Sequence, residues 1–113
     1  MTEDELKYLV DVQIFVDELI EIVGVEKRFE HFNNNLIYRR AIERQFELIG
    51  EAAKNFKTTN TEIEITHSKE IIGLRNRIAH AYDSIDYTVL WAIVINHIPN
   101  LKAEIDELIK KYE

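Results

Sequence analysis

The chain has 113 residues, of which 46% are hydrophobic and 31% charged, a composition typical of one globular domain. It contains no cysteine, which excludes disulfides, thiolate metal sites and a cysteine nucleophile. The net charge of −7 argues against nucleic acid as a partner, but seven of the 21 acids lie within residues 1–21 and the rest of the chain is nearly neutral.

Apolar residues recur at helical spacing through most of the chain. The first helix is predicted to run from an N-cap at Thr2 to an end at Gly24, with acids in its first turn where the helix dipole favours them. The stretch HFNNN at 31–35 predicts a break, because asparagine side chains compete with helical hydrogen bonds. A second long helix is predicted over 36–56. Gly50 lies inside it and indicates the close approach of another helix.

Residues 57–66 are polar and β-branched and predict a loop, in which the alternation EIEI leaves a short strand possible. A third helix is expected to begin near Thr66–Ser68 and to end in a turn at DSID, residues 83–86. Together with the helices that follow, this pattern predicts an all-α, up-and-down bundle of four long helices and a short fifth, forming one domain over residues 1–113.

A fourth helix is predicted over 87–97. It is apolar almost all round, so we expect it to be the most buried helix, with Trp91 as a core or interface anchor. Pro99 either kinks this helix or opens a fifth one that ends near Lys110.

Membrane insertion and export are not expected. No apolar run approaches the roughly 18 residues that a membrane span needs. Residues 1–23 are too acidic for a signal peptide, which requires a basic start and an apolar run. We therefore expect a cytoplasmic protein without membrane contact.

The stretch LRNRIAHAY, residues 74–82, places two arginines, an asparagine, a histidine and a tyrosine at the end of the third helix. On a helix, Arg75 and Tyr82 share one stripe, Asn76 and His80 share the adjacent one, and Arg77 points elsewhere. These groups suit RNA cleavage without a metal. A histidine can take or give a proton near neutral pH, and an arginine matches phosphate oxygens with paired donors.

A single histidine can hardly act as base and acid at once, so a two-fold dimer with this helix at its interface is an attractive arrangement. Structural alternatives stay open. The helix dipole alone favours His80 in a last turn, Tyr82 suits the edge of a core, and Arg75 or Arg77 can pair with Glu70 or Asp83.

The pattern R-x₄-H-x-Y, from Arg75 to His80 and Tyr82, resembles the signature of the HEPN-domain proteins of the HepT-like toxin group. The preceding EIIGLRNRIAH, the segment AIERQFELIGEAAK at 41–54 and the tryptophan-bearing helix after the motif are also similar, so the resemblance covers essentially the whole chain.

This resemblance implies a homodimer with a composite cleft and metal-independent endoribonuclease activity on RNA, without a cofactor. Arg75 and His80 match the family's catalytic pair, and Asn76 matches the supporting polar residue. It also implies a minimal nucleotidyltransferase antitoxin as the partner, which transfers AMP to Tyr82. The added phosphodiester would fill the substrate's place and neutralise the charge of the site.

Three hypotheses remain at this point. The chain is a ribonuclease toxin, or a non-catalytic helical subunit that binds a nucleotidyltransferase or a nucleotide, or a plain helical dimer.

Glu51 on the second helix is expected to have a structural or orienting role. The acidic first helix either faces away from the cleft or contacts the antitoxin. No metal site is predicted, because the other histidines are far apart in the sequence: His31, His67 and His97.

Overall fold

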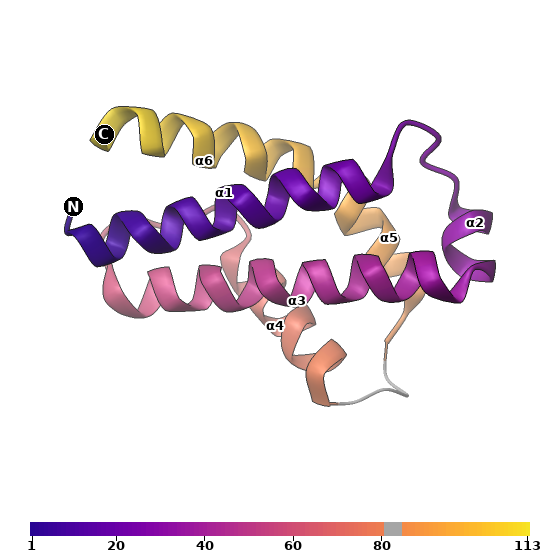
Figure 1. The fold of residues 1–113 in the computed structure, drawn as a ribbon. Coiled ribbons are helices and arrows are strands. Elements are labelled where there is room, and N and C mark those ends of the chain that lie inside the picture. Colours follow the sequence, from indigo (N-terminus) through magenta and orange to yellow (C-terminus); the bar gives the residue numbers. More distant parts are fainter. Residues whose placement is uncertain (81–84) are drawn as a thin grey trace.

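The computed structural model describes residues 1–80 and 85–113 and is helical throughout its regular part (Figure 1). Within these residues there are six helices and no strand. Their bounds are α1 Glu3–Val23, α2 Phe29–Asn34, α3 Leu36–Thr59, α4 Ser68–His80, α5 Tyr87–Asn96 and α6 Ile98–Tyr112. The predicted all-α class is confirmed.

The ends of α1 follow the local signals in the sequence. The Thr2 hydroxyl accepts from the backbone N–H of Glu5 at 3.2 Å, and the Glu5 carboxylate accepts from the N–H of Thr2 at 3.0 Å. This reciprocal capping satisfies two N–H groups that a helix start leaves open. Gly24 ends the helix with a φ of 73°, a conformation that costs glycine little.

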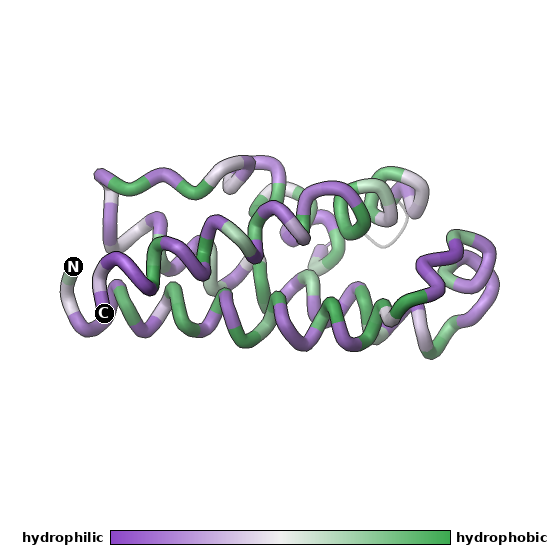
Figure 2. Tube along the Cα trace, turned by 90° about the horizontal axis from the view of Figure 1, so that it is seen from above, coloured by the Kyte–Doolittle hydropathy of each residue, from purple (hydrophilic) through white to green (hydrophobic). Residues whose placement is uncertain are grey.

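The long helices α1, α3 and α6 lie side by side, with α1 between the other two and antiparallel to both (Figure 1). α4 packs against α3, and α5 packs against α6 and α2. Figure 2 shows the hydrophobic positions recurring along each helix, as one-sided burial requires. The fully buried large side chains include Leu9, Leu19, Phe32, Ile42, Phe46, Ile49, Phe56, Leu90 and Ile105.

The predicted break at 31–35 is wrong, because most of that stretch belongs to the short helix α2. Phe32 is fully buried and its ring lies 5.0 Å from that of Trp91, so tertiary packing outweighs the weak helix preference of the asparagines. The break is confined to Asn35, whose side chain accepts from the N–H of Tyr38 at 2.9 Å and caps α3.

One further boundary differs from expectation. α3 continues to Thr59, three residues beyond its predicted end, before the Asn60 side chain accepts from the N–H groups of Glu62 and Ile63 and turns the chain. No strand forms at 62–65. Pro99 lies in the first turn of α6 and opens that helix, where its missing N–H leaves no bond unmade.

α5 is not the most buried helix, contrary to the prediction. It buries Leu90, Trp91 and Val94, whereas Val89 is 46% exposed and Ile93 half-buried. Trp91 is a core anchor, as expected. α5 packs closely against α2 and α6 over only part of its circumference, and its side with Val89 and Ile93 borders a groove shared with α4.

No helix in the described ranges has the length and apolar character required to cross a lipid bilayer.

Candidate active site

The C-terminal half of α4 carries the motif residues that the structure describes. Arg75 is half-buried, whereas Asn76, Arg77 and His80 are exposed. Tyr82 lies outside the described residues. The expected placement of the motif on one helix end is therefore confirmed as far as His80, the last residue of α4.

α4 crosses α3 in close contact at Gly50. A Cβ atom built on Gly50 would lie 2.4 Å from Cβ and 2.6 Å from Cγ of Arg75. These distances are far inside van der Waals contact, so only glycine allows the two helices to approach this closely. The predicted reason for a glycine inside this helix is confirmed.

The guanidinium of Arg75 is held from two sides. Its Nη2 lies 2.7 Å from Oε2 of Glu51 on α3, and its Nη1 donates to Oδ1 of Asn76 at 3.0 Å. The alternative pairing of Arg75 with Glu70 is wrong, since the Glu70 carboxylate lies 3.9 Å from Nδ1 of His67 instead. Glu51 therefore faces the motif helix.

The contact with Arg75 fixes which way the Asn76 amide points. A guanidinium has only donors, so the Asn76 atom that faces it is the carbonyl oxygen. Within residues 1–80 and 85–113, the NH₂ group of Asn76 has no acceptor and is a donor at the exposed surface of α4. Asn76 and His80 are four residues apart and lie on the same side of the helix. A donor, an arginine and an imidazole therefore come from one helix end.

His80 is exposed in the last turn of α4. Arg77 points away from Arg75 and lines a groove between α4 and α5. Apolar residues form much of the rest of this groove: Gly73, Leu74, Val89 and Ile93.

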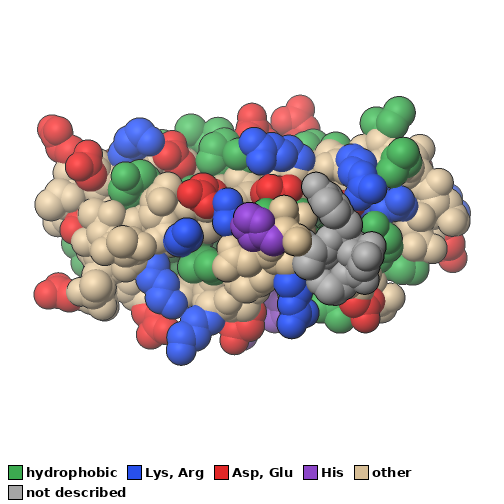
Figure 3. All heavy atoms as spheres, turned by 90° about the horizontal axis from the view of Figure 1, so that it is seen from below, with side chains coloured by type: hydrophobic (Ala, Val, Ile, Leu, Met, Phe, Trp, Pro, Cys, Tyr) green, Lys and Arg blue, Asp and Glu red, His purple; other side chains and the backbone are tan. Residues whose placement is uncertain are grey.

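Figure 3 views the molecule from below and shows Lys and Arg side chains spread around a central histidine, with acidic side chains between them. On α3, Arg40 pairs with the buried Glu43 at 2.8 Å, and the exposed Arg44 lies 3.6 Å from Glu47. The charge of Glu43, and then its hydrogen bond, raise the pKa of Arg40 above its ordinary value.

Two histidines that are 30 residues apart in the sequence come together. The rings of His67 and His97 have their centroids 4.7 Å apart, a contact that the sequence did not predict because it joins the start of α4 to the start of α6. Over residues 1–80 and 85–113, no three His, Asp or Glu side chains gather in a way that would hold a metal ion.

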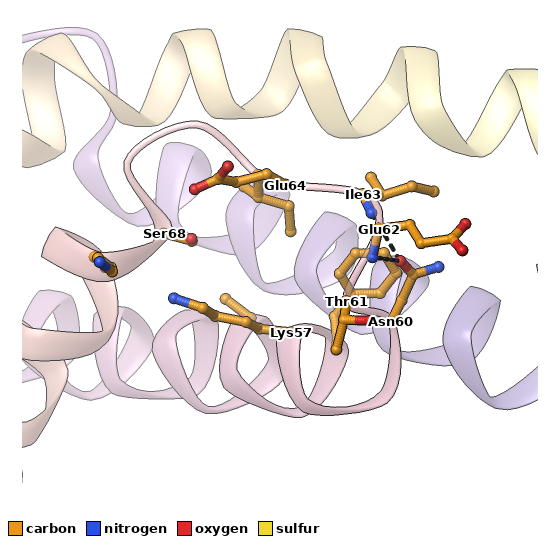
Figure 4. Close-up of a pocket in the computed structure, with 11 residues that line it drawn as sticks. Lys57, Asn60, Thr61, Glu62, Ile63, Glu64 and Ser68 are labelled. Carbon is orange, nitrogen blue, oxygen red and sulfur yellow. Dashed lines mark hydrogen bonds between the residues drawn. The ribbon is translucent and has the colours of Figure 1, made fainter.

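A separate pocket lies between the end of α3, the loop after it and the start of α4 (Figure 4). Lys57, Asn60, Glu64 and Ser68 are among its lining residues. The length of α4 places it about 18 Å from His80. It is therefore not part of the motif surface.

Comparison with known proteins decides the family. The sequence profile described as ribonuclease HepT-like matches residues 12–108. The chain belongs to the HepT-like family. This HepT-like chain is 36% identical over 114 residues to the "probable ribonuclease HepT" of Thermococcus cleftensis, covering 97% of the chain and all of that relative. The predicted family membership is confirmed.

Other relatives of this HepT-like chain carry names of the same kind. A protein of Methanocaldococcus jannaschii, described by its name as a candidate RNase, is 31% identical over 94% of the chain and 91% of its own length. One from Caldanaerobacter subterraneus, with the same description, is 34% identical over 74% of the chain and 75% of its length. No solved structure matches the chain. The HepT-like family is a family of ribonucleases, and the match includes the whole of α4.

Proposed function

We propose that this HepT-like protein is a cytoplasmic, metal-independent endoribonuclease that acts as the toxin of a toxin–antitoxin pair. The observation that carries the proposal is the end of α4, which presents an arginine paired with Glu51, an amide whose oxygen faces that arginine, and an exposed histidine. The site residues are Arg75, Asn76 and His80.

The proposed reaction uses the RNA's own 2′-hydroxyl as the nucleophile. An imidazole takes the proton of this hydroxyl, and the 2′-oxygen attacks the adjacent phosphorus. The bond to the 5′-oxygen breaks, and that oxygen leaves with a proton from a second acid. Arg75 and the NH₂ of Asn76 donate to the phosphorane oxygens, where negative charge builds up. The products are a 2′,3′-cyclic phosphate and a 5′-hydroxyl.

A homodimer would supply the second acid, because each protomer brings one His80 to a shared cleft. The apolar side of α5 supports this arrangement. Val89 is exposed and borders the α4–α5 groove beside the motif helix, and an exposed apolar surface of this kind is typical of an interface. RNA would then bind across both copies of α4.

The control of this activity is proposed to lie at Tyr82, two residues after His80. A minimal nucleotidyltransferase antitoxin would transfer AMP to its hydroxyl, which forms a phosphodiester on the tyrosine and releases pyrophosphate from ATP. The family resemblance supports this step. The added phosphate would compete with the substrate phosphate for Arg75 and oppose the binding of another anion.

We expect the purified protein to cleave single-stranded RNA in the presence of excess EDTA and to leave 2′,3′-cyclic phosphate ends. A matched RNA with a 2′-O-methyl group at every position should be resistant, because its nucleophile is blocked. Gel electrophoresis with end-group analysis measures both results. Cleavage of the methylated RNA, or complete loss of cleavage with EDTA, would contradict the proposed mechanism.

We expect co-expression with a nucleotidyltransferase encoded beside this gene to raise the intact mass by one or more AMP units and to abolish RNA cleavage. A Tyr82→Phe protein should stay unmodified and active in the same experiment, and peptide mass spectrometry locates the modification. If the protein binds the nucleotidyltransferase but never cleaves RNA, modified or not, the non-catalytic subunit becomes the better assignment.

A further inference from the structure

Glu51 is the residue outside the motif that touches it most directly. Its Oε2 lies 2.7 Å from Nη2 of Arg75 and is shielded from water, although the Glu51 side chain as a whole is 45% exposed. The Arg75 side chain is only 20% exposed. Because water does not reach Oε2, it screens this ion pair less than a pair between two exposed side chains.

The close contact at Gly50 sets up this pair. Since Gly50 has no side chain, the Cβ and Cγ of Arg75 rest directly on α3. The guanidinium then reaches the next residue along α3, which is Glu51. Gly50 and Glu51 together form what we call the seat of Arg75. Gly50 leaves room for Cβ and Cγ of Arg75, and Glu51 pairs with its guanidinium.

The seat leaves the guanidinium little freedom to rotate. Glu51 attracts Nη2 by its charge, without a hydrogen bond at Oε2, and Asn76 accepts a hydrogen bond from Nη1, while Nε is buried and has no acceptor within the described ranges. A free arginine has many rotamers, and ordering it on substrate binding would cost conformational entropy. An arginine fixed beforehand makes its donors available to a phosphorane without that cost.

We propose that Glu51 is a positioning residue for RNA cleavage, which acts by holding Arg75 in the orientation that stabilises the phosphorane; this inference rests on the proposed function. Glu51 does not contact the substrate. Its negative charge opposes the binding of an RNA phosphate, so its contribution lies in the chemical step and not in substrate affinity.

The test is steady-state cleavage by Glu51→Gln, Glu51→Asp and Glu47→Gln. Glu47 is a matched control, because it lies one turn earlier on α3 and pairs with Arg44 instead of Arg75. For Glu51→Gln we expect kcat to fall about ten- to hundredfold while KM stays constant or falls. Glu51→Asp should recover part of kcat, and Glu47→Gln should stay within about twofold of the unsubstituted protein.

Any of three results would overturn the proposal: an unchanged kcat in Glu51→Gln, a higher KM as its main effect, or an equal loss of kcat in Glu47→Gln. The first shows that Glu51 is dispensable for catalysis. The second assigns it to substrate binding. The third reduces it to a general charge effect of α3.

A second measurement needs no RNA cleavage, so it separates this inference from the proposed function. Rotation about the Cζ–Nε bond of Arg75, measured by NMR with Arg75→Lys for assignment, should be slow in the unsubstituted protein and fast in Glu51→Gln. If Glu51→Gln does not fold, slow rotation in the unsubstituted protein and in Glu51→Asp still supports the seat. Fast rotation in the unsubstituted protein would overturn it.

Discussion

His80→Ala is expected to lower RNA cleavage by about 10²- to 10⁴-fold, which is the contribution of a general acid or base. Because His80 is exposed and alanine favours a helical position, the melting temperature should hardly change. Initial rates on a defined RNA and a thermal melt measure the two effects. The same substitution should abolish growth inhibition in cells if cleavage is the toxic activity.

The control for this variant is His67→Ala. His67 is also exposed, but it precedes α4 and therefore lies at the opposite end of that helix. Its substitution should leave cleavage within about twofold, since it precedes His80 by 13 residues, about 20 Å along the helix axis. Retention of more than a tenth of the activity in His80→Ala would remove this histidine from the mechanism.

Gly50→Ala is expected to lower both stability and cleavage. The new methyl group would meet Cβ and Cγ of Arg75 at 2.4 and 2.6 Å, and Cβ cannot move without the α4 backbone. Overpacking of this kind costs about 1–3 kcal/mol, which corresponds to a melting temperature lower by roughly 4 °C or more in a domain of this size. Cleavage should fall further, because the shift of α4 separates Arg75 from Glu51.

Gly73→Ala is the matched control, because Gly73 lies inside α4 and has nothing within 4 Å of the added Cβ. Without a clash, the change should stabilise the helix by about 0.5–1 kcal/mol. Calorimetry of both variants gives the sign of each effect. Equal melting temperatures for the two would show that α3 and α4 are not in tight contact at Gly50.

Much of the helical framework was predictable from the sequence, because its signals are local. The cap at Thr2, the end at Gly24 and the proline that opens α6 each depend on residues within one or two turns. The order Arg75, Asn76, His80 on one helix also follows from spacing alone. Even the close approach at Gly50 was predictable, since a glycine inside a helix has few other uses.

The tertiary structure decided which side chains pack against each helix. The short helix α2 packs through Phe32 against Trp91, whereas the asparagines beside Phe32 in the sequence predict a break. The exposed side of α5 depends on which helices surround it. The sequence by itself determined the family, the two ends of α1, the start of α6 and the motif. Only the fold could select Glu51 as the partner of Arg75, because that choice depends on how two helices cross and not on any local preference.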